Sequence, residues 1–194
     1  MKSQLLNCLS RIVSENLDLD EIEKLFESLK KEDQTMTELN KLIKDTPVEK
    51  QALISASSFL LYFEGCYVAS IDRICLLLIM SGHDLYDFFR RKFAKTLEEI
   101  GNIDINTKFR FLEEHGFKRL VRQRDRELRN KIAHLDFVVE GKFIKINGEN
   151  VCAVGRLINL CIFTDKIFNV LIEVLAEFGN VVKEYAEKMG VQIP

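Results

Sequence analysis

The 194-residue sequence contains two prolines, no tryptophan and no long apolar run free of charge. The prolines are Pro47 and Pro194, so a helix between them meets no proline break and long helices are favoured. The most apolar region, residues 52–80, is interrupted by three charged side chains. We therefore expect a buried helix there, and neither a membrane span nor a membrane partner.

Cysteine is present but shows no paired spacing. The five cysteines include no C-x-x-C pair, which argues against a disulfide framework and against a cysteine zinc site. The N-terminus carries charged residues at helical spacing rather than an uninterrupted apolar stretch, so no signal peptide is expected. These features predict a cytoplasmic protein with reduced thiols in its core. The cysteines are Cys8, Cys66, Cys75, Cys152 and Cys161.

Motifs typical of enzymes that use nucleotides, zinc or a nucleophilic serine are missing. The sequence has no G-x-x-x-x-G-K-[ST], G-x-G-x-x-G, H-E-x-x-H or G-x-S-x-G. Its three histidines, His83, His115 and His134, have no partners at metal-ligand spacing. We therefore predict no metal site and no cofactor.

Apolar residues recur at helical spacing along most of the chain, and we expect two parts. Residues 1–45 are predicted to form an acidic helical extension. The Thr46-Pro47 pair is a helix-start signal that opens the second part, residues 46–194, with a central helix that reaches Met80 and is loosened at Gly65. Further helices are expected at residues 3–14, from 20 onward, and at 36–43, 84–100, 107–115, 118–134 and 155–189.

The pattern changes before the last helix. Apolar residues alternate with polar ones, and Asn147-Gly148 is a strong tight-turn signal. A small β-hairpin is therefore predicted between about Asp136 and Ala153. The expected fold class is all-α: an up-and-down helical bundle with a small β-hairpin insertion before the last long helix.

The near-neutral net charge of −2 hides one basic segment. Residues 118–131 carry seven basic and two acidic side chains, a net +5 that leaves the remainder of the chain at −7. Arg119, Arg122, Arg126 and Arg129 follow at steps of three or four, so they share one helix face. Such a ridge suits a polyanion. The alternative is a solvated arginine face paired with carboxylates of the same chain.

The basic segment runs into Arg129, Asn130 and His134, a set suited to phosphodiester chemistry. Asn130 and His134 are four apart and lie on the same helix face, whereas Arg129 is about 140° around the helix from His134 and must curl toward it. Arginine can bind phosphate oxygens and stabilise charge on phosphorus. Histidine can move a proton near neutral pH, and asparagine can orient either group.

This motif, at the end of a basic helix in a bundle of long helices, resembles the HEPN superfamily (higher eukaryotes and prokaryotes nucleotide-binding domains). The family hallmark is an arginine, then commonly Asn, Asp or His, then a histidine a few residues later. The resemblance covers roughly residues 47–189. It implies a metal-independent RNA endonuclease of toxin–antitoxin, abortive-infection or CRISPR-associated type, which acts as a homodimer whose two motifs meet in one cleft.

Carried over by position, the resemblance assigns the catalytic roles to Arg129, Asn130 and His134. Families of this kind often steady the arginine with an acid from an earlier helix, for which Glu64 and Asp72 are the candidates, although either acid can instead pair with another basic residue. The residues expected to hold flanking RNA phosphates are Arg119, Arg122, Arg126 and Lys131.

Two other hypotheses stay open. In the first, the bundle is a non-catalytic module that binds RNA or nucleotide or dimerises, alongside a nucleotidyltransferase or other antitoxin-type protein. In the second, it is a plain helical scaffold in which the motif occurs by chance.

Overall fold

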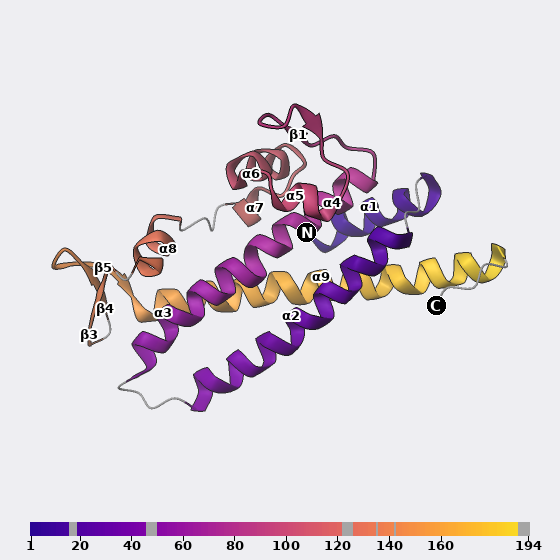
Figure 1. Ribbon diagram of the computed structural model, residues 1–194. Helices are drawn as coiled ribbons and strands as arrows, with labels where there is room; N and C mark the ends of the chain where they lie inside the picture. The colour runs from indigo at the N-terminus through magenta and orange to yellow at the C-terminus, as the bar shows by residue number, and fades with distance from the viewer. Residues whose placement is uncertain (16–18, 46–49, 122–125, 135, 142, 190–194) are drawn as a thin grey trace. The chain divides into compact units, whose positions relative to one another are not determined.

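The computed structural model describes residues 1–15, 19–45, 50–121, 126–134, 136–141 and 143–189 (Figure 1). These residues are mostly helical, as the sequence predicts, and include two small antiparallel sheets. Among them, no helix has both the length and the apolar character needed to cross a membrane.

The helical elements include one π-helical segment, η2, which continues from α3 and leads into α4. They are α1 (Lys2–Glu15), α2 (Leu19–Asp45), α3 (Gln51–Leu61), η2 (Tyr62–Val68), α4 (Ala69–Met80), α5 (Leu97–Gly101), α6 (Ile105–Glu114), α7 (Lys118–Val121), α8 (Arg126–Ala133) and α9 (Val154–Met189). The strands are β1 (Tyr86–Asp87), β2 (Lys92–Phe93), β3 (Val138–Glu140), β4 (Phe143–Ile146) and β5 (Glu149–Ala153).

Several predicted helices differ from the observed ones in length. The two helices expected after residue 20 form the single helix α2. The central helix is helical from Gln51 to Met80, with the π segment at Gly65, whereas the Thr46-Pro47 start signal lies outside the described residues. Residues 122–125, in the middle of the helix predicted at 118–134, also lie outside them.

The predicted helix over residues 84–100 is wrong. The segment forms the β1–β2 hairpin and then the short helix α5. The carboxylate of Asp87 accepts hydrogen bonds from the backbone N–H groups of Phe89 and Arg90, and Arg91 has φ +53°, a conformation that a right-handed helix does not contain. The hydrogen bonds from the backbone to the Asp87 side chain therefore override the helical spacing of the aromatic residues.

The predicted two-stranded hairpin is a three-stranded sheet, so that prediction needs correction. Strand order is β3–β4–β5, with Val139 opposite Ile144 and Ile144 opposite Cys152. The expected tight turn is confirmed, because Asn147 and Gly148 both have positive φ, as a type I′ turn requires. A second turn at Gly141, which also has positive φ, adds the third strand.

Contacts divide the chain into two compact units. Unit 1 comprises Met1–Leu29, Ser70–Lys118 and Asn169–Pro194, and unit 2 comprises Lys30–Ala69 and Arg119–Phe168. The helices α2 and α9 therefore each contribute residues to both units. The predicted boundary at residue 45 separates an acidic extension from a helical bundle. It stays a prediction.

The core of unit 1 is apolar, but it also encloses charged groups. Apolar side chains such as Ile12, Leu112 and Phe178 are almost fully buried. Among them, Lys108 Nζ lies 2.5 Å from Asp72 Oδ1, with side chains 2% and 14% exposed. Both the Nε and one terminal nitrogen of the buried Arg73 donate to Ser28 Oγ. These buried charged groups thus have polar partners within unit 1, as burial requires.

The cysteines whose side chains are described are free thiols in the core. Cys8, Cys66, Cys75 and Cys161 are buried, whereas the Cys152 side chain lies outside the described residues. Burial raises the pKa of the Cys75 thiol, and it raises the pKa of Cys161 to about 12. These thiols therefore stay protonated and unreactive near neutral pH.

Candidate active site

Unit 2 contains all the residues predicted to act on RNA except Asp72. The helix α8, which carries Arg129, Asn130 and Lys131, packs against α3. Leu128 and Ile132 form its buried face. Because these two residues are four apart, they fix the rotation of α8 and leave the intervening polar side chains partly exposed.

The π-helical segment η2 lies in the same unit and carries Glu64. π-Helices are rare, and they occur often at functional sites. The rings of Phe59, Phe63 and Tyr67 pack in sequence, with centroids 5.8 and 5.2 Å apart. The buried Tyr67 hydroxyl donates to the Leu120 carbonyl at 2.7 Å, which fixes the end of α7 against η2. The sequence pattern gave no signal for this hydrogen bond, because its two residues lie 53 positions apart.

Glu64 and Arg129 form an ion pair. Arg129 Nε donates to Glu64 Oε1, and Arg129 Nη1 donates to Asn130 Oδ1 at 2.7 Å. Three of the predicted site residues are therefore in direct contact, although 65 positions separate Glu64 from Arg129. The two bonds hold the guanidinium through Nε and Nη1, and a guanidinium carries further N–H donors that can bind a phosphate.

The exposure of this pair limits what it contributes to stability. The Arg129 side chain is 32% exposed and that of Glu64 is 47% exposed. Ion pairs this accessible to solvent stabilise a fold by about 0–1 kcal/mol. The contact therefore orients the guanidinium more than it stabilises unit 2.

The second candidate acid, Asp72, has a different partner. It lies in unit 1 and pairs with Lys108. Burial raises the pKa of the Asp72 carboxyl, and the Lys108 charge opposes that rise. The carboxylate that contacts Arg129 is thus Glu64.

His134 follows the last residue of α8 and is exposed. Its backbone N–H donates to the Asn130 carbonyl at 3.0 Å, so His134 continues the helical hydrogen-bond pattern one turn beyond Asn130. An imidazole at an exposed helix end can exchange protons with solvent or with a bound substrate.

The predicted phosphate-binding residues are described to different extents. Arg119 is exposed on α7, and Lys131 Nζ lies 2.9 Å from Asp136 Oδ2. Arg122 and the side chain of Arg126 lie outside the described residues. The partner of Lys131 comes from the next few residues of the chain, which the helical spacing did not indicate.

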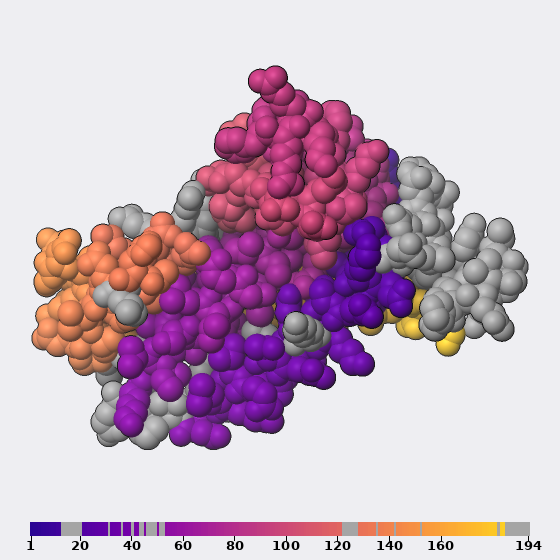
Figure 2. Space-filling model, viewed as in Figure 1, coloured from indigo at the N-terminus to yellow at the C-terminus, as the bar shows by residue number. Residues whose placement is uncertain are grey.

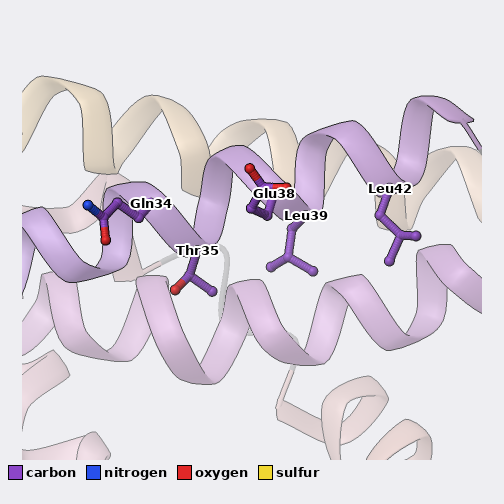
Figure 3. A pocket seen from close by; sticks show the side chains of 5 residues that line it. All are labelled: Gln34, Thr35, Glu38, Leu39 and Leu42. Carbon is purple, nitrogen blue, oxygen red and sulfur yellow. The ribbon is translucent and has the colours of Figure 1, made fainter.

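A hollow in unit 2 lies apart from these residues in the sequence. Its volume is about 440 Å³, and it is lined from α2 by Gln34, Thr35, Glu38, Leu39 and Leu42. In Figure 3, Leu39 and Leu42 point toward the helix drawn beneath α2. Glu38 Oε1 accepts a bond from Lys41 at 2.8 Å, so this carboxylate has a structural partner. The lining includes none of the predicted catalytic residues.

Within the described ranges, no group of three or more histidine, cysteine and acidic side chains is arranged to hold a metal ion. Comparisons with known proteins add no relative: no family model matches the chain, and no curated protein or solved structure matches it. The functional hypothesis therefore depends on the residues and their geometry.

Proposed function

We propose that the protein is a HEPN-like, metal-independent endoribonuclease that cleaves single-stranded RNA, with an up-and-down helical bundle as its catalytic domain. The observation that carries the proposal is the Glu64–Arg129–Asn130 contact, followed one turn later by the exposed His134. It combines an oriented cation for a phosphate with an accessible proton carrier. RNA transesterification uses groups of both kinds.

In the proposed reaction, a base removes the proton of the ribose 2′-hydroxyl, and the oxygen attacks the adjacent phosphorus. The bond from phosphorus to the 5′-oxygen breaks, and an acid protonates the leaving oxygen. The products carry a 2′,3′-cyclic phosphate and a 5′-hydroxyl. Arg129 stabilises the negative charge that develops on the phosphoryl oxygens, and His134 transfers a proton.

One histidine cannot readily act as base and acid in the same step, so we propose a homodimer in which each copy supplies one His134. An apolar face on α3 supports this arrangement. Leu53 and Leu61 are 57% and 53% exposed, and their spacing of eight places them on the same side of the helix. A second copy that covers this face would lie next to the segment that carries Glu64.

The direct test is RNA cleavage in excess EDTA by the purified protein. We expect His134→Ala and Arg129→Ala each to slow cleavage by about a hundred-fold or more, because each removes a group used in the transition state. His83→Gln and Arg110→Gln, in unit 1, are matched controls that should cut like the wild type. Equal rates for wild type and the two motif variants would refute the proposal.

Mixing wild-type and inactive protein tests the composite site. If each cleft needs one His134 from each copy, excess His134→Ala protein should lower the activity of the wild-type copies after subunit exchange, because a mixed dimer holds a single His134. A wild-type protein that is fully active as a monomer would contradict the composite site while leaving the motif assignment in place.

The Glu64–Arg129 pair also favours a second candidate function. A guanidinium already neutralised by a carboxylate can hold α8 to η2 without any catalytic role. The protein would then be a non-catalytic RNA-binding or dimerisation module, with a nucleotidyltransferase or other antitoxin-type protein as a proposed partner. RNA binding by the wild type with no cleavage product in the EDTA assay would favour this function.

A further inference from the structure

Unit 1 contains a short hairpin with a rigid turn and an unusual surface. The strands β1 and β2 pair Tyr86 with Phe93 and Asp87 with Lys92. The buried Asp87 carboxylate accepts the backbone N–H groups of Phe89 at 2.9 Å and Arg90 at 3.1 Å. These two hydrogen bonds hold the backbone of the turn in place. Figure 2 shows the hairpin, in magenta at the top of the view, projecting from the surface of its unit.

The exposed apolar side chains of this hairpin are all aromatic. Phe88 is 66% exposed, Phe89 88% and Phe93 50%. The Tyr86 ring packs against Phe88 and Phe93, with centroids 5.1 and 5.2 Å away and interplanar angles of 85° and 67°. Because at least half of each phenylalanine is exposed, the cluster offers ring surface for further stacking.

Cations are interleaved with these rings. Arg90 and Arg91 occupy the turn beside Phe88 and Phe89, and all four residues are exposed. Arg90 Nε lies 3.9 Å from Asp87 Oδ2, a long ion pair, so its charge is only weakly compensated. Lys92, by contrast, forms an ion pair with Glu99 of the same unit. The apex of the hairpin thus combines stacking surface with positive charge.

We propose that this hairpin is a binding site for single-stranded nucleic acid. Bases stack on Phe88 and Phe89, and the phosphates on either side contact Arg90 and Arg91. Open aromatic faces next to cations are the usual means of binding single strands without reading their sequence. The site consists of unit 1 residues and does not depend on cleavage at Arg129 and His134.

A lipid surface is the main alternative occupant, and the position of the charges disfavours it. The four consecutive turn residues are Phe88, Phe89, Arg90 and Arg91. Inserting the two phenylalanines into a hydrocarbon layer would bring two adjacent guanidinium groups toward it, which is costly. On a nucleic acid, the same two groups meet phosphates.

The test uses fluorescence anisotropy of the full chain with labelled uridine and thymidine oligonucleotides of about ten nucleotides, within the usual site size of single-strand binding modules. The DNA strand has no 2′-hydroxyl, so the proposed nuclease cannot cut it, and binding is measured whether or not the protein is an enzyme. We expect Phe89→Ala to weaken binding about ten-fold, because one stacking platform is lost.

Arg91→Gly separates recognition from folding. Arg91 has φ +53°, which glycine adopts readily, so this variant removes a charge and relieves backbone strain. We expect weaker binding and a salt dependence of log K reduced by about 0.7, the loss of roughly one phosphate contact. Two controls in unit 1 should bind like the wild type. Val181→Ala removes a different exposed apolar group, and Arg110→Gln removes a different exposed charge.

Two outcomes would overturn the proposal. In the first, Phe89→Ala and Arg91→Gly bind both oligonucleotides as tightly as the wild type. In the second, the wild type binds phosphatidylcholine–phosphatidylserine vesicles in a Phe89-dependent way and binds neither oligonucleotide, which would assign the hairpin to a membrane surface. Loss of RNA cleavage in His134→Ala with unchanged DNA binding would leave this site intact and concern the nuclease alone.

Discussion

Two of the cation–carboxylate pairs in the described residues each have one partner in the central helical stretch from α3 to α4, and they differ in their environment. In unit 1, Lys108 and Asp72 are enclosed, with side chains 2% and 14% exposed. In unit 2, Arg129 and Glu64 are 32% and 47% exposed. The two acids are only eight residues apart in the sequence. Their burial, rather than their chemistry, separates a structural pair from one that is open to a substrate.

The difference has an energetic basis. Water no longer solvates a buried charge, so each partner becomes necessary to the other. An exposed pair retains much of its solvation, and its members remain accessible to a ligand. A catalytic arginine must be able to bind a phosphate while its carboxylate partner orients it. Arg129 meets the condition, and Lys108 does not.

The largest expected effect is on stability, at the buried pair. Lys108→Met keeps the aliphatic stem but removes the direct ion-pair partner of the largely buried Asp72, and we expect a loss of about 3–5 kcal/mol in the free energy of unfolding. Urea denaturation followed by circular dichroism measures it. RNA cleavage by the fraction that stays folded should be unchanged, because Lys108 lies in unit 1.

The double variant Lys108→Met/Asp72→Leu is the control. Replacing both charges with apolar groups removes the unpaired carboxylate, and most of the lost stability should return. A double variant no more stable than Lys108→Met alone would mean that packing, rather than charge compensation, explains the loss.

Tyr67→Phe tests whether a buried contact in unit 2 also contributes more to stability than an exposed one. The substitution removes the hydroxyl that donates to the Leu120 carbonyl and leaves that carbonyl without this donor in the core. We expect unfolding to become easier by about 1–3 kcal/mol, through the cost of the lost hydrogen bond. Phe63→Leu, which changes the neighbouring ring but no hydrogen bond, is a useful comparison. No change in the denaturation midpoint of Tyr67→Phe would contradict burial as the deciding factor.

At the exposed pair, the expected effect moves from stability to activity. Glu64→Gln should change the free energy of unfolding by about 1 kcal/mol or less. If Glu64 positions Arg129, kcat for RNA should fall while KM changes little, because a neutral amide orients the guanidinium less firmly. Glu64→Asp should restore part of kcat. A Glu64→Gln enzyme with wild-type kcat would show that the carboxylate is not a positioning residue.

Local patterns in the sequence predicted much of the helical framework and failed where a side chain binds the backbone. The apolar spacing of α1, α6 and α9 is sufficient to place each within a few residues, since nothing competes with the helix there. Residues 84–100 have comparable spacing. There, however, Asp87 binds two backbone N–H groups and Arg91 takes a positive φ, and neither event leaves a periodic signal.

The candidate site, too, could be predicted only in part from the sequence. Arg129, Asn130 and His134 are close in sequence, so their types and spacing could be recognised directly. The choice between Glu64 and Asp72 could not be made, because it depends on how α8 packs against α3 and on the π-helical turn. Such a turn adds a residue to the helix and shifts the face on which later side chains lie.

The smallest expected effect is a pH dependence in unit 1. Burial is the main cause that lowers the pKa of His83, and the nearby His115, with its ring centroid 4.3 Å away, lowers it further. As the pH falls below about 6.5, the unfolded chain therefore takes up a proton at His83 before the folded protein does, and the free energy of unfolding should decrease. Denaturation midpoints measured between about pH 7 and pH 5 test this, and His83→Gln should flatten the slope. A slope unchanged by His83→Gln would assign the acid sensitivity to other groups. A slope removed by His134→Ala instead would reverse the comparison, because the exposed histidine of unit 2 would then be the one coupled to folding.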